Sequence, residues 1–337
     1  MRRSLLLAGL LIVVAAGDPM LGRRLLIAGG GGSFQTSLTG LPTDGSWTRH
    51  ASNPVISPTQ SWEETSVQEP NTLSDGAGGW IAWCKGGWAS GGATGYYTSA
   101  DGITWTHYAS NPVLGRGGSS VADTLSQPGI IKSGSTFYLY VNDPADVPSN
   151  DPFVYLGTDG LAWTIGNGGV HYAVDPGTFT SWGNRTTWIE GATWYQLLEA
   201  RQGGIWKVFL LTSSDGESYT FLNGSNPLTS LQPAGGYNYG GPMLAGGGAI
   251  DGTYHLYYHS GSGSTSDIYH ATSTDRINWT ITNGGSPILT HTGTGWEIDQ
   301  IADPDVHLYQ GTWYMWFAAV DNTGETGRII LATAPAT

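Results

Sequence analysis

The sequence of 337 residues has little charge and a single cysteine. Because Cys84 has no partner in the chain, an intrachain disulfide framework is excluded. Asp and Glu number 26 against 13 Lys and Arg, which gives a formal net charge of −13. A nucleic-acid partner is therefore not expected, since binding to phosphates needs a basic face. Neutral carbohydrates remain open as partners.

The sequence also lacks any long stretch with the apolar spacing of a helix. Its eight histidines show no metal-ligand spacing, and no glycine-rich phosphate loop or Ser-His-Asp arrangement stands out. Glycine, tryptophan and tyrosine are abundant instead, with 52, 15 and 17 residues. Glycine-rich turns between aromatic strands are typical of an all-β protein.

One short motif recurs along the chain. In its clearest copy, Asp101-Gly102 forms a predicted tight turn, Trp105 follows on the next strand, and Asn111-Pro112 ends that strand. Asp-Gly suits such a turn because the turn needs positive φ, which glycine adopts freely. The aromatic residue of the motif repeats every 56 to 60 residues, at Trp47, Trp105, Trp163, Tyr219 and Trp279. A fixed period in strand-rich sequence predicts a β-propeller.

The repeats contain five sets of three inner strands and five outer strands, but the two series are out of phase. The first outer strand, Trp47–His50, precedes any inner strand, whereas the last inner set ends at Arg328–Thr333 with no outer strand after it. Pairing of these two segments would close a ring and hide two sheet edges. We therefore predict a single five-bladed β-propeller of four-stranded blades over residues 33–337.

The first 32 residues differ from the rest. Met1–Ala16 has two arginines followed by an apolar run, which resembles a secretory signal and is too short for a comfortable transmembrane helix. A second basic and apolar segment leads into Gly29–Gly32. Residues 1–32 are interpreted as an apolar leader or anchoring arm with a glycine-rich linker. The protein is expected to be extracellular or surface-displayed, and a retained arm would dock onto other protein subunits, as in a virion or another assembly.

Propeller geometry brings the starts of the innermost strands and the ends of the second strands to one face. The first ring of residues expected there is Glu69, Gln127, Arg185, Gly241 and Asp303. The second ring is Lys85, Asn142, Glu199, His259 and Ala318. For any one of these residues, a hydrogen-bonded place in a wet tunnel is the simpler interpretation. For the set, a central ligand pocket is the better one, because only 12% of the chain is charged.

Two carboxylates of the first ring lie in blades that become neighbours once the ring closes. Glu69 belongs to blade 1 and Asp303 to blade 5. Facing carboxylates are what glycoside hydrolysis needs, one to protonate the leaving oxygen and one to act as base or nucleophile. Arg185 could hold one of them ionised, and Glu199 is a reserve acid. The alternative is a structural cluster or a calcium site in the central tunnel.

Further ligand contacts are expected around this pair. Strand alternation puts Asn71 and Asp305 on the same side as the two carboxylates. Trp62, Trp182 and Trp296 lie in loops that lead into innermost strands, where their rings could stack on sugars. Packing between blades is the alternative for each of these tryptophans.

The repeated Asp-Gly hairpin, the pairs Trp62-Glu63 and Trp296-Glu297, and the text Asp303-Pro304-Asp305 resemble the furanosidase-type five-bladed propellers. That superfamily includes arabinanases, xylosidases, invertases and related phosphorylases. The resemblance covers Ser46–Thr337 and implies the propeller fold. It also implies an Asp at the start of the first innermost strand, an Asp in the second and a Glu acid further round.

Those positions depart from the family pattern, since Glu69 and Gln127 stand at the first two and Arg185 at the third. The expectation is therefore a surface- or virion-displayed propeller that recognises glycans or serves as a structural or adhesion component, without catalysis. The alternative is an extracellular glycoside hydrolase of the furanosidase type, with Glu69 and Asp303 as the carboxylate pair. Because the first ring differs in every blade, one central site is expected rather than five.

Overall fold

The structure is a computed structural model that describes residues 40–87, 92–115, 126–143, 151–234, 237–262 and 264–336. The leader or arm predicted for residues 1–32 lies outside the described residues, and so do residues 33–39. Within the described part of the chain, no helix is long and apolar enough to cross a bilayer.

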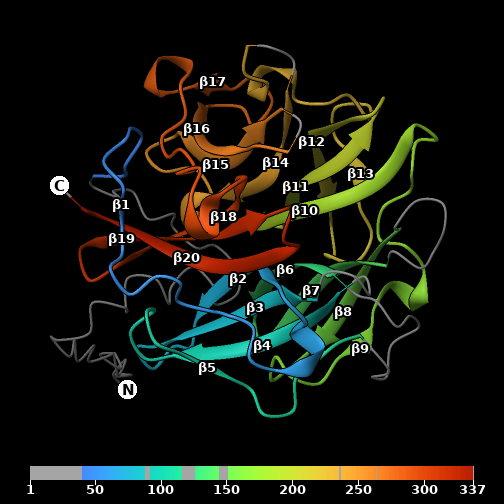
Figure 1. Ribbon diagram of the computed structural model, residues 1–337. Helices are drawn as coiled ribbons and strands as arrows, with labels where there is room; N and C mark the ends of the chain where they lie inside the picture. The colour runs from blue at the N-terminus through green and yellow to red at the C-terminus, as the bar shows by residue number, and fades with distance from the viewer. Residues whose placement is uncertain are drawn as a thin grey trace, which may run out of the picture.

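The strands form five separate four-stranded antiparallel sheets. Blades 1 and 2 consist of β2 (Val67–Ser74), β3 (Trp80–Gly86), β4 (Ala93–Ser99), β5 (Trp105–His107), β6 (Ser126–Ser133), β7 (Thr136–Asp143), β8 (Asp151–Gly157) and β9 (Thr164–Ile165). Blades 3 and 4 consist of β10 (Phe179–Glu190), β11 (Thr193–Gln202), β12 (Ile205–Ser213), β13 (Thr220–Phe221), β14 (Asn238–Leu244), β15 (Tyr254–Gly261), β16 (Asp267–Ser273) and β17 (Thr280–Ile281). Blade 5 consists of β18 (Gln300–Tyr309), β19 (Thr312–Asp321), β20 (Thr326–Pro335) and β1 (Thr48–Arg49). The five innermost strands β2, β6, β10, β14 and β18 meet at the centre of the molecule (Figure 1).

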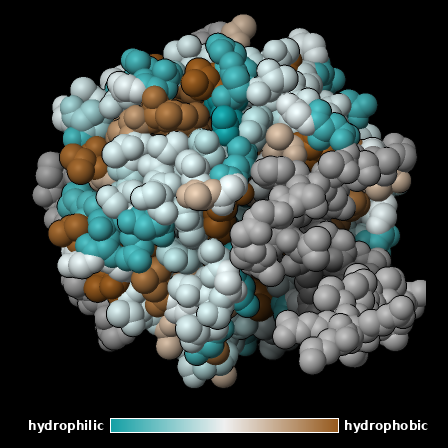
Figure 2. All heavy atoms as spheres, turned by 180° about the vertical axis from the view of Figure 1, so that it is seen from behind, coloured by the Kyte–Doolittle hydropathy of each residue, from teal (hydrophilic) through white to brown (hydrophobic). Residues whose placement is uncertain are grey.

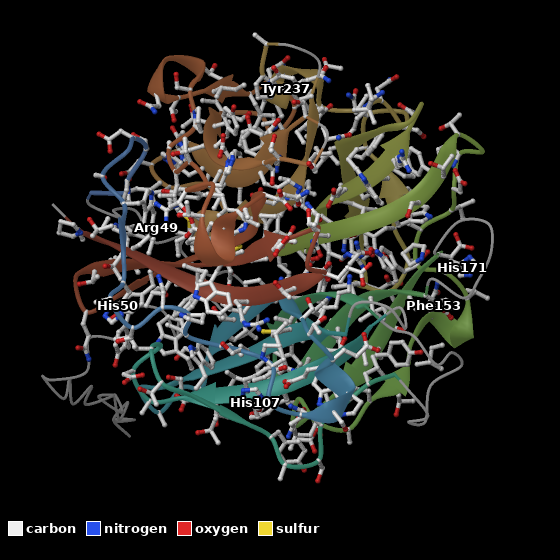
Figure 3. All side chains as sticks on the ribbon, in the orientation of Figure 1. Arg49, His50, His107, Phe153, His171 and Tyr237 are labelled. Carbon is white, nitrogen blue, oxygen red and sulfur yellow. The ribbon has the colours of Figure 1, made fainter. Side chains whose placement is uncertain are left out.

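The predicted ring closure is confirmed, because β1 pairs antiparallel with β20 as the outer strand of blade 5. Trp47, just before β1, is only 6% exposed and packs edge-on against Tyr257 of blade 4, with ring centroids 6.0 Å apart. Arg49 of β1, labelled in Figure 3, forms an ion pair at 2.5 Å with Glu297 of η6 (Gly295–Glu297). The N-terminal strand therefore ties blades 4 and 5 together.

The aspartate of the recurring motif fixes the turn before the outer strand in blades 1 to 4. The backbone N–H groups of Ile103 and Thr104 donate to Asp101 Oδ1 at 2.8 and 2.7 Å, which fixes the turn. Asp159, Asp215 and Asp275 accept the same pair of bonds in their own blades. Asn111 then binds both the N–H and the C=O of Tyr96 with its side chain, at 2.8 and 3.0 Å, which fastens the segment after the outer strand to its neighbour.

Aromatic side chains fill the spaces between blades. At the junction of blades 5 and 1, Trp80 and Trp316 are both 1% exposed or less and meet edge to face with centroids 4.9 Å apart. Trp316 donates its indole N–H to Gly102 O at 2.8 Å, so the turn of blade 1 is anchored to blade 5. Phe153 and His171 make a similar edge contact at the border of blade 2 (Figure 3).

Short 3-10 turns occur in the connections between strands. They are η1 (Ser61–Glu63), η2 (Asn167–Gly169), η3 (Thr229–Leu231), η4 (Ala245–Gly247), η5 (Asn283–Gly285) and η6. On the face seen in Figure 2, the hydrophobic residues of the described part are scattered among hydrophilic ones.

Candidate active site

Each innermost strand carries a register shift near its start. In blades 1, 2, 4 and 5 this shift contains the Xaa-Pro pair whose first residue is the ring position, at Glu69, Gln127, Gly241 and Asp303. In blade 3 the shift lies between Trp182 and Arg185, and of the two residues inside it Asn184 lines the central cavity.

The prediction of Arg185 as the third ring member was wrong by one residue. In the other four blades a proline follows the ring residue, and the prediction used this Xaa-Pro pair to align the blades with one another. Blade 3 has Arg185 at the proline position, so the ring residue is Asn184. Asn184, which lines the cavity, was not among the predicted residues, and its place inside the register shift of blade 3 is not visible in the sequence.

The backbone is strained at three of the ring positions. Glu69, Gln127 and Asp303 have φ values of 56°, 58° and 52°, and Gly241 has 56°. Glycine tolerates this left-handed conformation, whereas other residues incur a cost of about 1–2 kcal/mol each. Strain of this kind is retained where the surrounding structure enforces it, and it clusters at functional sites.

The ring encloses a cavity of about 170 Å³. Its wall is formed by Gln68, Glu69, Gln127, Asn184, Glu199, His259, Gln300, Ala302, Asp303, Val320 and Asn322. A smaller void of about 10 Å³ shares Glu69, Asn184 and Asp303 with the cavity and is also bordered by Arg185. Four first-ring residues therefore line the central cavity, whereas of the second ring only Glu199 and His259 do so.

Glu69 is a buried acid at the cavity with a raised pKa. Its side chain is 7% exposed and lies 3.4 Å from Lys85 Nζ, measured from Oε1. Burial raises the pKa of Glu69 to about 7, against the attraction of Lys85 and with added repulsion from Asp303 and Glu199. A carboxyl with this pKa carries a proton for much of the neutral range and is suited to act as a general acid.

Glu199 and Asp303 are brought together by Asn184. The backbone N–H of Asn184 donates to Glu199 Oε2 at 3.1 Å, and its side-chain Nδ2 donates to Asp303 Oδ1 at 2.7 Å. The N–H of Gly241 gives Glu199 Oε2 a second bond at 3.2 Å. Burial raises the pKa of Glu199, partly offset by His259. The carboxylates of blades 1, 3 and 5 thus converge on one cavity.

His259 completes this group from blade 4. Its Nδ1 lies 3.3 Å from Asp303 Oδ1 and 3.2 Å from the backbone N of Asp303. Burial opposes protonation of His259, but the hydrogen bond and charge of Asp303, together with Glu199, outweigh it and raise the pKa of the imidazole. The imidazole of His259 therefore lies directly beside the Asp303 carboxylate.

The remaining predicted residues mainly hold the blades together. Arg185 Nη2 donates to Asn142 Oδ1 at 2.6 Å, and Asn142 Nδ2 bonds to Gln127 Oε1 and to backbone carbonyls of blade 3. Asn71 binds blade 2 through Pro128 O at 3.2 Å. Asp305 accepts the N–H of Thr72 in blade 1 at 2.7 Å. Asn71 borders the smaller void, whereas Asp305 does not line either space.

The three predicted sugar-stacking tryptophans have different environments. Trp62 is 9% exposed and Trp182 is fully buried, so the prediction that they stack on a ligand was wrong. Trp62 fills the space above Gly86 and Gly95, where any Cβ would clash with its ring. Trp296 is 47% exposed, with the Arg328 guanidinium 5.1 Å from its ring centroid. Trp296 alone of the three can stack on a sugar.

Residues 40–336, apart from the undescribed gaps, contain no group of three His, Cys, Asp or Glu side chains that could hold a metal ion. The described residues thus do not fit the calcium site considered from the sequence.

The fold is similar to that of solved carbohydrate-active enzymes. A glycosyl hydrolase from Bacteroides ovatus superposes with a TM-score of 0.66 at 16% identity, covering 89% of this chain and 99% of that one. A structure from the GH130 family of mannoside phosphorylases, which contains glycoside hydrolases that target β-1,2 mannosidic linkages in Candida mannan, gives 0.66 at 15% identity over 89% and 99%. A thermostable family-43 glycoside hydrolase gives 0.60 at 14% identity over 80% and 88%. No protein-family model and no curated protein matches the chain in sequence.

These neighbours confirm the resemblance to five-bladed propellers of the glycoside hydrolase type at the level of fold. They also correct the expectation of a non-catalytic propeller for display or adhesion. The neighbours are described as glycoside hydrolases and phosphorylases. In this chain, moreover, Glu69, Glu199 and Asp303 line one cavity instead of being dispersed.

Proposed function

We propose that this chain is a glycoside hydrolase whose central cavity binds a carbohydrate and cleaves its glycosidic bond. The observation that carries the proposal is the convergence of Glu69, Glu199 and Asp303 on one cavity in a chain with only 12% charged residues. Burying three carboxylates together is costly, so an arrangement of this kind is a marker of function. The enzymatic descriptions of the structural neighbours point in the same direction.

Glu69 is the proposed general acid. Its pKa of about 7 lets it deliver a proton to the leaving glycosidic oxygen near neutral pH. Asp303 is the proposed base or nucleophile, because its carboxylate is held in place by Asn184 Nδ2 and lies next to His259. The proton moves from Glu69 to the leaving oxygen while Asp303 either activates water or attacks the sugar carbon. Glu199 is the reserve acid of the site.

We further propose that the enzyme acts outside the cell, on the strength of the secretory-type sequence Met1–Ala16. Glycans of the surroundings would then reach the cavity directly. N-terminal sequencing of the protein recovered from culture medium tests this, since a start after Ala16 is the expected result and a full-length cell-bound chain contradicts it.

The catalytic proposal is tested with a panel of aryl pyranosides and furanosides. Wild type is compared with Glu69→Gln and Asp303→Asn, and Glu325→Gln, an exposed carboxylate in the β19–β20 turn, is the matched control. At least one glycoside should be cleaved by wild type and the control, with a loss of about 10²–10⁴-fold in each site variant. Rates with and without inorganic phosphate separate hydrolysis from phosphorolysis. Cleavage that persists in both site variants, or none by wild type, contradicts the proposal.

A further inference from the structure

The amide of Asn184 has a fixed orientation. Nδ2 donates to Asp303 Oδ1 at 2.7 Å, and the backbone N–H of the same residue donates to Glu199 Oε2 at 3.1 Å. A flipped amide would place its oxygen against the Asp303 carboxylate, where two acceptors repel each other. The nitrogen therefore faces Asp303, and Oδ1 points elsewhere.

That oxygen is buried without a partner. Asn184 is 9% exposed, lines the cavity, and its Oδ1 makes no hydrogen bond with any described group. Among the described residues that line the cavity, one other buried side-chain atom is unpaired, and it is Glu69 Oε2. Buried polar atoms are nearly always satisfied, so these two atoms call for partners from water or from a bound molecule that displaces it.

The chemistry of these atoms defines what binds. Asn184 Oδ1 accepts a hydrogen bond, whereas Glu69 Oε2 accepts one when the carboxyl is ionised and donates one when it is protonated, so a hydroxyl group, which does both, suits both points. A neutral sugar offers hydroxyl donors on adjacent carbons. A uronate would instead bring an acceptor-only carboxylate close to Glu199 and Asp303, where like charges repel.

We propose that Asn184 is a substrate-positioning residue. Its Oδ1 accepts a hydrogen bond from a hydroxyl group of a neutral sugar, while its side-chain Nδ2 holds Asp303 in place and its backbone N–H holds Glu199 in place. The inference rests on the proposed function and specifies it, because it names neutral glycosides as the substrate class. Asn184 forms part of the sequence Asn-Arg-Thr, which matches a glycosylation acceptor, but burial at the cavity keeps its side chain from that role in the folded protein.

The test compares wild type, Asn184→Ala and Asn184→Asp, with Asn226→Ala as an exposed control. On the best neutral aryl glycoside, Asn184→Ala should lose 10- to 100-fold in kcat/KM, and KM should rise. On the deoxy analogue that lacks the contacted hydroxyl, wild type and Asn184→Ala should become equal within about threefold. Asn184→Asp keeps the acceptor but loses the donor to Asp303, so its loss should fall mainly on kcat and shift the pH profile. Aryl uronides should not be cleaved by any variant.

The outcomes separate this inference from the proposed function. Cleavage by wild type that is unchanged in Asn184→Ala, or equal cleavage of uronides, overturns the inference and leaves the hydrolase standing. If wild type cleaves nothing, binding of neutral monosaccharides and of glucuronate is measured by calorimetry. Binding of a neutral sugar that is lost in Asn184→Ala then supports the inference although the hydrolase has failed. Absence of binding, or binding of glucuronate as tight as that of the neutral sugars, overturns both. Thermal unfolding verifies folding, and Asn184→Ser replaces Asn184→Ala if the alanine variant does not fold.

Discussion

Replacing Glu69 with glutamine should stabilise the protein at high pH and much less at low pH. In the folded protein burial raises the pKa of Glu69 from its ordinary value of 4.5 to about 7. The folded state therefore favours the protonated carboxyl, and the stability that this preference contributes is complete below pH 4.5 and is lost as pH rises through 7. A shift from 4.5 to about 7 corresponds to about 3 kcal/mol between those limits. Glutamine is neutral throughout and avoids that loss.

The assay is equilibrium unfolding in urea at pH 4, 6 and 8 for wild type and Glu69→Gln. The free energy of unfolding of the variant minus that of wild type should increase by about 3 kcal/mol from pH 4 to pH 8. Other titrating groups are common to both proteins and largely cancel in the difference. Glu325→Gln, which removes an exposed carboxylate, should give a difference that varies little with pH. A flat difference for Glu69→Gln would refute the argument that burial sets the proton affinity of this residue.

Three other substitutions test the closure of the ring of blades, the position of the Glu199 carboxylate and the role of the exposed Trp296. Trp47→Ala should reduce the free energy of unfolding by about 3–5 kcal/mol, because a buried indole at the ring closure is lost, and urea unfolding measures it. A Cβ on Gly240 would lie 2.2 Å from Glu199 Oε1, so Gly240→Ala should displace that carboxylate and lower kcat, whereas Gly45→Ala, whose Cβ meets nothing closer than 3.9 Å, should leave kcat unchanged. Trp296→Ala should raise KM several-fold for oligosaccharides but not for aryl monoglycosides, and equal KM values for both proteins on oligosaccharides would argue against a stacking role.

The sequence predicts the fold well because the fold is a repeat. The hairpin around Asp101 recurs at a nearly constant period, and its side chain makes the same backbone bonds in several blades. The unmatched strand Trp47–His50 predicts ring closure, since a propeller that leaves one blade with three strands would expose two edges. These predictions depend on local turn chemistry and on counting, both of which are visible in the sequence.

The site was predicted less completely because its geometry depends on the register shift of each innermost strand. The Xaa-Pro pairs located Glu69 and Asp303. Blade 3 has no proline at this point, so its alignment with the other blades was off by one residue and gave Arg185 instead of Asn184. The orientation of loop tryptophans is likewise set by tertiary packing. Trp62 is buried above two glycines that are distant in sequence, and no local pattern distinguishes it from the exposed Trp296.

The most direct test of the central claim is the dependence of Glu69→Gln activity on the leaving group. A general acid matters only when the departing oxygen needs a proton, so aryl glycosides with a poorly acidic phenol should show a loss of about 10²–10⁴-fold in kcat/KM relative to wild type. Dinitrophenyl glycosides, whose leaving group departs without protonation, should show little loss. An equal loss on both substrates, or no loss on either, would contradict the account of Glu69 as the acid of a glycoside hydrolase.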